Sequence, residues 1–67
     1  MKVLVNDKEH LLEASSMTIT ELLEKLNIPS IGLVADLDGQ IINNAELSSK
    51  NISDGSKIEL IRIVGGG

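Results

Sequence analysis

Apolar and polar residues alternate at the start of the chain, as they do in a β-strand with one buried face. The alternation in residues 2–6 is weak: Val3 and Val5 fall on one face of such a strand, and Lys2, Leu4 and Asn6 fall on the other. Residues 6–9 form a polar cluster of turn-forming residues, and residues 10–13 can pair back as a second strand. The pattern predicts an N-terminal β-hairpin.

Helical spacing replaces this alternation after a short Ser-rich stretch. Thr18 is followed three positions later by Glu21, so that each side chain can bind the other's free backbone N–H at the start of a helix. Asn27 can take the left-handed conformation that closes a helix, and Pro29 prevents continuation. Apolar residues at helical spacing form one stripe, which consists of Ile19, Leu22, Leu23 and Leu26. The sequence therefore predicts one short amphipathic helix.

The following region predicts a second hairpin. Residues 33–37 and 40–42 are aliphatic runs typical of strands, and Asp38-Gly39 between them can supply the positive φ angles of a tight turn. Residues 43–53 are polar and are expected to be irregular, with room for one helical turn at residues 45–47. The hairpin is therefore followed by a long connection.

A turn at Asp54-Gly55 leads into a final strand at residues 58–64. A single helix with one apolar stripe must cover one face of a sheet. The intervening chain is long enough for the first and last strands to lie side by side in parallel. We therefore expect an α+β fold of the β-grasp (ubiquitin-like) type, a mixed sheet of four to five strands with one main helix packed on one face. Residues 1–64 would form this domain, and residues 65–67 a flexible glycine tail.

Composition narrows the function. The 67 residues allow one domain, and the absence of Phe, Trp and Tyr leaves aliphatic residues to fill the core and excludes aromatic stacking on nucleic-acid bases. A net charge of -4 argues against binding to phosphate backbones and favours a partner with a basic docking surface. Without cysteine there are no disulfides, and the single histidine, His10, has no ligand-like spacing around it that would predict a metal site. No run is long enough for a signal peptide or membrane span, so we expect a cytoplasmic protein. We also expect it to be monomeric when free.

The residues after the last strand are the strongest candidate for chemistry. Gly65, Gly66 and Gly67 have no side chains that could hold them against a surface, and glycine permits close backbone approach inside a narrow channel. The Gly67 carboxylate could be adenylated by ATP, giving a mixed anhydride open to attack by sulfur or nitrogen. Terminal glycines can equally be an unstructured end without function. Because no pair of nucleophile and base stands out among the side chains, we expect a co-substrate of other enzymes rather than an enzyme.

The last strand also suggests a docking surface. Glu59 marks one face of this strand as exposed to solvent, and Ile61 and Ile63 share that face. In one interpretation, the two isoleucines pack under a neighbouring loop or are ordinary exposed aliphatic residues, which are common on protein surfaces. In the other, the two isoleucines form a docking patch with Leu4, and Arg62 adds a charge contact near the tail. The predicted partner-binding residues are then Leu4, Ile61, Arg62, Ile63, Gly65 and Gly66.

Over essentially its whole length, the chain resembles the ThiS family, the small sulfur-carrier proteins of thiamine biosynthesis. The segments that carry the resemblance are the opening 3–7, the helix start 18–23, the hairpin 38–42, the turn 54–55 and the strand ending in Gly66-Gly67. Ubiquitin-like modifiers share the terminal Gly-Gly, whereas the short length and the Val-Asn-Asp opening favour ThiS. Related sequences often carry Pro-Arg where this chain has Asn43-Asn44, and asparagine where it has Asp38.

The resemblance implies a pathway for sulfur. An E1-like adenylyltransferase would adenylate the Gly67 carboxylate with ATP and magnesium, and sulfur from a persulfide donor protein would replace the AMP to give a thiocarboxylate. Thiazole synthase would then take the sulfur for the thiazole ring of thiamine, and the chain itself would bind no cofactor. Two alternatives stay open. One is the small subunit of molybdopterin synthase or another sulfur carrier, for which a longer chain with aromatic residues is expected; the other is a ubiquitin-like modifier or interaction module.

Overall fold

The computed structural model describes residues 1–63, so that Val64 and the predicted glycine tail, residues 65–67, lie outside the described part. Five strands form one sheet in the order β2-β1-β7-β4-β5. The strands are β1 (Lys2–Val5), β2 (Lys8–Leu11), β4 (Leu33–Leu37), β5 (Gln40–Ile42) and β7 (Lys57–Arg62). β1 and β7 are parallel and the other neighbours are antiparallel, which confirms the predicted mixed sheet of an α+β fold.

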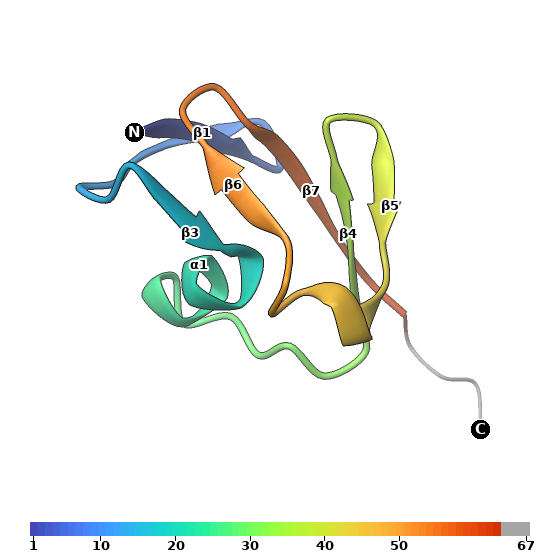
Figure 1. Ribbon diagram of the computed structural model, residues 1–67. Coiled ribbons are helices and arrows are strands. Elements are labelled where there is room, and N and C mark those ends of the chain that lie inside the picture. The colour runs from blue at the N-terminus through green and yellow to red at the C-terminus, as the bar shows by residue number, and fades with distance from the viewer. Residues whose placement is uncertain (64–67) are drawn as a thin grey trace.

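The helix begins where the sequence predicts and packs beneath the sheet in Figure 1. α1 (Ile19–Lys25) has Thr18 as its N-cap: Thr18 Oγ1 accepts from the Glu21 backbone N–H at 3.1 Å, and Glu21 Oε1 accepts from the Thr18 N–H at 2.8 Å. Asn27 has φ 57° and closes the helix in the left-handed conformation. No helix in residues 1–63 has the length and apolarity needed to cross a bilayer.

The core between α1 and the sheet is aliphatic apart from one methionine. Alternation along each strand turns every second side chain toward the helix, so the strands contribute pairs such as Val3 and Val5. The buried apolar residues are Val3, Val5, Met17, Ile19, Leu22, Leu23, Leu33, Ala35, Ile42, Leu47, Ile52 and Ile58. Full burial of an aliphatic side chain contributes about 1.5–3 kcal/mol, and these residues therefore provide most of the stabilisation of a small domain.

The first hairpin is tighter than the sequence predicted. β2 begins at Lys8 rather than at His10, and Val5 pairs directly with Lys8. Asn6 and Asp7 have φ values of 50° and 68°, so these two residues alone make the turn. Two consecutive positive φ angles are typical of the type I′ turn, whose twist matches that of the strands it joins. The prediction of a four-residue turn was wrong because Asn and Asp tolerate this conformation well.

A second, two-stranded sheet was not predicted. β3 (Ser16–Thr18) pairs antiparallel with β6 (Asn51–Ser53), in regions expected to be loop and irregular chain. The single turn expected at residues 45–47 is a 3-10 helix, η1 (Asn44–Glu46), one residue earlier. In β3 and β6 the only buried residues are Met17 and Ile52, which pair with each other. Strands of three residues with one buried position show no detectable alternation.

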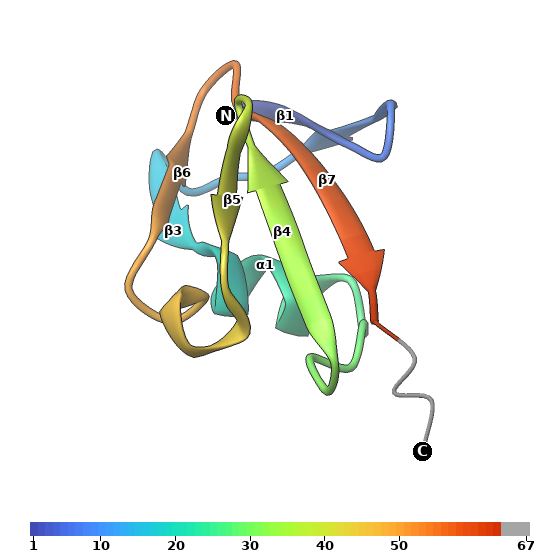
Figure 2. The same ribbon diagram turned by 90° about the vertical axis from the view of Figure 1, so that its right-hand side faces the viewer.

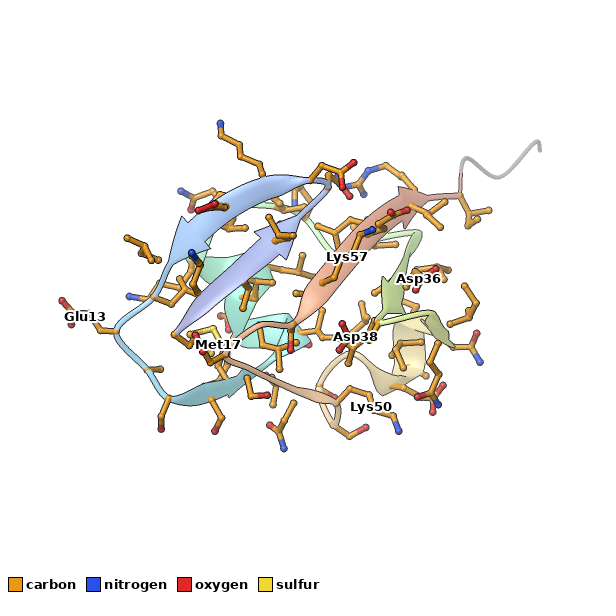
Figure 3. All side chains as sticks on the ribbon, turned by 90° about the horizontal axis from the view of Figure 1, so that it is seen from above. Glu13, Met17, Asp36, Asp38, Lys50 and Lys57 are labelled. Carbon is orange, nitrogen blue, oxygen red and sulfur yellow. The ribbon has the colours of Figure 1, made fainter. Side chains whose placement is uncertain are left out.

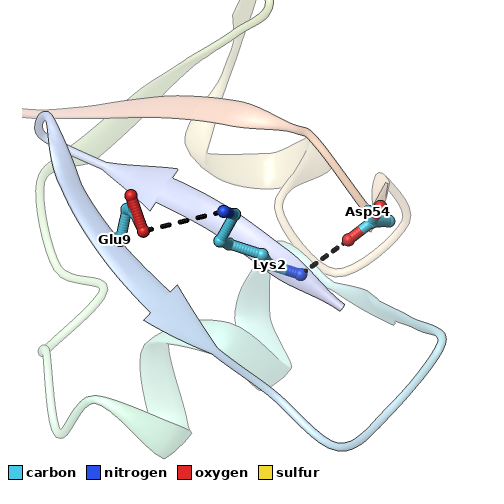
Figure 4. Close-up of polar contacts among 3 residues, drawn as sticks. All are labelled: Lys2, Glu9 and Asp54. Carbon is cyan, nitrogen blue, oxygen red and sulfur yellow. Dashed lines mark hydrogen bonds and ion pairs between the residues drawn. The ribbon is translucent and has the colours of Figure 1, made fainter.

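The turn that precedes β7 is attached to β1 (Figure 4). The backbone N–H of Lys2 donates to Asp54 Oδ1 at 2.8 Å, and the N–H of Gly55 donates to the Lys2 carbonyl at 2.8 Å. Lys2 Nζ also lies 3.8 Å from Glu9 Oε2 on β2, but both side chains are exposed, so this ion pair adds little stability. The two hydrogen bonds therefore fix where β7 begins.

Candidate functional site

β7 carries the chain from the core to the edge of the domain. It lies in the middle of the sheet, and Ile58 is fully buried between Val5 of β1 and Leu37 of β4. Figure 2 shows β7 running diagonally from this position to the lower edge of the domain, where the described chain ends at Ile63. The strand that precedes the predicted tail is thus held at its base by the core itself.

Ile61 and Ile63 are exposed, as the alternation along this strand predicted. Their side chains are 43% and 57% exposed. Ile61 pairs with Val34 of β4 on the open face of the sheet, opposite α1, and Val34 is half-buried. The two isoleucines therefore extend an apolar strip toward the end of β7. That this strip binds a partner stays a prediction.

Leu4 lies apart from this strip. It is half-buried and pairs with Lys57, the first residue of β7, whereas Ile61 lies near the other end of the strand. Lys57, Glu59 and Ile61 follow one another along the open face of β7. The charged residues Lys57 and Glu59 therefore lie between Leu4, which pairs with Lys57, and Ile61. The structure brings Ile61 close to Val34 and does not bring Leu4 to either isoleucine. A partner would have to cover charged residues in order to contact both.

The exposed Arg62 side chain forms two hydrogen bonds within the domain. Its Nη1 donates to the carbonyl oxygen of Ile31 at 2.6 Å, and its Nη2 donates to that of Pro29 at 3.0 Å. Both acceptors belong to the loop that joins α1 to β4. The predicted charge contact from Arg62 to a partner stays a prediction, and in the described structure this guanidinium links the end of β7 to the loop.

Two residues near the end of β7 were not predicted to belong to the site: Gly32, and Asn44, which the sequence marked only as a departure from related sequences. Gly32 has φ +68, and a Cβ on it would lie 2.9 Å from the carbonyl oxygen of Ile63, so both its conformation and its contact with the residue after β7 favour glycine. The N–H of Ile63 donates to the Gly32 carbonyl at 2.7 Å. Asn44 Nδ2 donates to the carbonyls of Ser30 and Leu33 at 2.6 and 3.0 Å. The sequence offered two signals, a glycine just before a strand and the departure at Asn43-Asn44, and neither shows which carbonyls would be bound.

The open face also carries a shallow hollow with acidic walls. The residues that line it are Asp36, Asp38, Gly39, Lys57 and Glu59. Figure 3 labels Asp36, Asp38 and Lys57 among them. Asp36 Oδ1 accepts from the Gly39 N–H at 2.8 Å, and Asp38 Oδ1 accepts from the Lys57 N–H at 2.9 Å, so both aspartates shape the hairpin and its junction with β7. Within residues 1–63, no three His, Cys, Asp or Glu side chains gather closely enough to hold a metal ion. The three carboxylates against one ammonium group suit a basic partner surface.

The remaining predicted site residues, Gly65, Gly66 and Gly67, lie outside the described residues. The structure therefore describes the surface around Ile63, the last described residue before them. That surface combines the apolar strip of Ile61 and Ile63, the loop bound by Arg62, and the acidic hollow along β7.

Comparison with known proteins gives a consistent result. The sequence model of the ThiS family matches residues 2–67. A thiazole synthase from Paramagnetospirillum magneticum is 30% identical over all 67 residues, and the chain spans only 20% of the length of that relative. The crystal structure of a thiamine biosynthesis protein (ThiS) from Geobacter metallireducens superposes with a TM-score of 0.86 at 28% identity, with full coverage of both chains. A solution structure of a thiamine biosynthesis protein from the same organism gives a TM-score of 0.75, covering 100% of this chain and 88% of the other.

Proposed function

The chain belongs to the ThiS family, and from this premise we propose that it is the sulfur carrier for the thiazole ring of thiamine. The observation that carries the proposal is the family match, which extends over residues 2–67 and so includes both β7 and the glycines after it. The two structural relatives named as thiamine biosynthesis proteins support the same role. In this role the chain is a co-substrate, and its partner enzymes supply the catalysis.

The proposed reaction takes place at the Gly67 carboxylate. An E1-like enzyme transfers AMP from ATP to this carboxylate with magnesium, and pyrophosphate leaves. The terminal sulfur of a protein persulfide then attacks the acyl carbon, a C–S bond forms and AMP leaves. A second thiol breaks the remaining S–S bond by thiol–disulfide exchange, which leaves a thiocarboxylate on Gly67. Each step requires the end of the chain to enter another enzyme's active site, for which glycine is suited.

Thiazole synthase is the proposed acceptor of the sulfur. The relative from Paramagnetospirillum magneticum bears the name thiazole synthase and contains a segment similar to this whole chain, which supports a pairing of the two activities. The exposed Ile61 and Ile63 next to the tail, with the acidic hollow beside them, are the surface that we expect partner enzymes to recognise.

The intact mass of the protein tests this proposal. After incubation with ATP, magnesium, an E1-like enzyme of thiamine biosynthesis and a persulfide donor, we expect the mass increase of one oxygen exchanged for sulfur. A variant that lacks Gly67 is expected to show no exchange. The double variant Ile61→Asp, Ile63→Asp is expected to keep the fold and lose most of the exchange, because charge replaces the apolar strip.

Two results would contradict the proposal. Exchange that persists without Gly67 would place the reaction elsewhere, and a failure of the natural chain to exchange would exclude the sulfur-carrier role. Lysine-linked conjugates in place of the exchange would indicate a ubiquitin-like modifier instead. Unchanged exchange in the double variant would remove only the docking role of the two isoleucines.

A further inference from the structure

The loop between α1 and β4, Pro29–Gly32, is hydrogen-bonded along its whole length. Loop carbonyls on a protein surface commonly bind water, but each of these four oxygens accepts a hydrogen bond from a residue outside the loop. In chain order, the bonds are Arg62 Nη2 to Pro29 O (3.0 Å), Asn44 Nδ2 to Ser30 O (2.6 Å), Arg62 Nη1 to Ile31 O (2.6 Å) and Ile63 N to Gly32 O (2.7 Å). The end of β7 and η1 together hold this loop in one conformation.

The same loop displays an apolar side chain to solvent. Ile31 is 85% exposed, which is the highest value among the large hydrophobic residues of the described chain. An isoleucine this exposed contributes little to the stability of the fold, whereas its burial by a partner would remove apolar surface from water and so favour binding. Because the backbone around it is already fixed, binding would not have to order the loop. The features are those of an anchor residue in a binding surface.

The short chain length between Ile63 and Gly67 means that a partner that binds Gly67 also comes close to this loop. Gly67 follows Ile63 by four residues, and a fully extended chain spans at most about 3.6 Å per residue, so Gly67 lies within about 14 Å of Ile63. An enzyme that brings its active site to Gly67 therefore also approaches the surface around Ile63. The hydrogen bond from Ile63 to Gly32 places the loop on that surface.

We propose that Ile31 is an anchor that inserts into an apolar pocket of thiazole synthase, and that Arg62 and Asn44 are positioning residues that hold it there. This inference rests on the proposed function, which names thiazole synthase as the acceptor. Thiazole synthase is chosen as the occupant because a thiazole synthase contains a segment similar to this chain. Arg62 then contributes through the loop and does not itself need to contact the partner.

The affinity of the full chain for thiazole synthase tests the anchor. Ile31→Ser is expected to raise the Kd about tenfold or more, the effect of losing a buried apolar anchor. Leu11→Ser is the matched control, since Leu11 is 81% exposed but lies on the edge strand β2, and its Kd is expected to stay unchanged. If the two variants bind as tightly as the natural chain, the anchor is excluded and the sulfur-carrier proposal stands. If the natural chain itself does not bind thiazole synthase, the proposed acceptor is wrong and the anchor fails with it.

A double-mutant cycle tests the positioning role. Arg62→Gln and Asn44→Ala are each expected to weaken binding several-fold in the natural chain and to have almost no further effect in the Ile31→Ser background. Arg62→Lys keeps the charge but not the two-pronged donor geometry, so it should weaken binding as Arg62→Gln does. Losses that add in the cycle, or full rescue by lysine, would overturn the positioning role in favour of a direct charge contact. Urea denaturation of each variant ensures that folded proteins are compared.

Discussion

The two ends of β7 are held in different ways. At its start, the strand lies between β1 and β4, and Ile58 is completely buried. Pairing with β1 reaches only Ile58, and beyond it Asn6 Oδ1 accepts the Leu60 N–H at 2.7 Å. At its end, β7 keeps β4 as its strand neighbour and exposes Ile61. One strand is therefore part of the core at its first residues and part of the surface at its last.

The difference shows how a small domain can fix both the position and the direction of a strand. Burial of apolar surface is strong but has no preferred direction, so Ile58 fixes where the strand lies without fixing where its end points. Hydrogen bonds depend on angle and distance. The bonds from Arg62 and Ile63 to the loop Pro29–Gly32 therefore set the geometry of the exposed end.

The largest expected effect is the difference in unfolding free energy between substitutions at the two ends of β7. Ile58→Ala should lower the free energy of unfolding by about 2–5 kcal/mol, because it leaves a cavity in the centre of the core. Ile61→Ala on the same strand should change it by about 0.5 kcal/mol or less. Urea denaturation followed by far-UV circular dichroism measures both. Similar losses from the two substitutions would show that the exposed end carries as much of the folding free energy as the buried one.

An intermediate effect is expected where the loop meets the end of β7. Gly39→Ala, at a position with φ +92 and nothing within 4 Å of the added Cβ, should cost about 1 kcal/mol for conformation alone. Gly32→Ala should cost roughly 1–2 kcal/mol more, because its Cβ would also meet the Ile63 carbonyl oxygen at 2.9 Å. Thermal or urea unfolding of both variants gives the difference. Equal costs would mean that the end of β7 moves aside freely.

The smallest effect concerns the side-chain bond at the middle of β7. Asn6→Gly permits the positive φ of 50° and removes the side chain that accepts the Leu60 N–H, so we expect a loss of about 0.5–1 kcal/mol. Asp7→Gly, next to it at φ 68°, should be neutral or slightly stabilising. Hydrogen exchange at the Leu60 amide provides a second readout, with faster exchange in Asn6→Gly alone. Unchanged exchange would show that this bond does not hold the strand.

Local patterns made much of the fold predictable from the sequence. The capping pair Thr18 and Glu21 marks the start of α1, because the interaction spans only three residues. Alternation in the last strand predicted that Ile58 is buried and Ile61 exposed. The paired Asp38-Gly39 predicted the β4–β5 turn, where φ is 50° and 92°.

The loop contacts could not be predicted, because they join residues far apart in the chain. Arg62 binds carbonyls 31 and 33 positions away, and Asn44 binds one 14 positions away. A backbone carbonyl has the same chemistry in every residue, so nothing in the sequence marks which one a guanidinium will meet. The short strands β3 and β6 were missed for a related reason, since their pairing depends on a partner more than 30 residues distant.

The parallel pairing of β1 with β7 has a consequence for the order of events during synthesis. β7 pairs with β1 on one side and β4 on the other and is the central strand of the sheet. It is also the last of the described strands in the chain, and therefore the last of them to leave the ribosome. Until it arrives, β1 and β4 have no common neighbour, and closing so long a loop is among the slower steps of folding. A nascent chain cut short before β7 would lack the middle of its sheet, and so could not display a finished recognition surface to any enzyme.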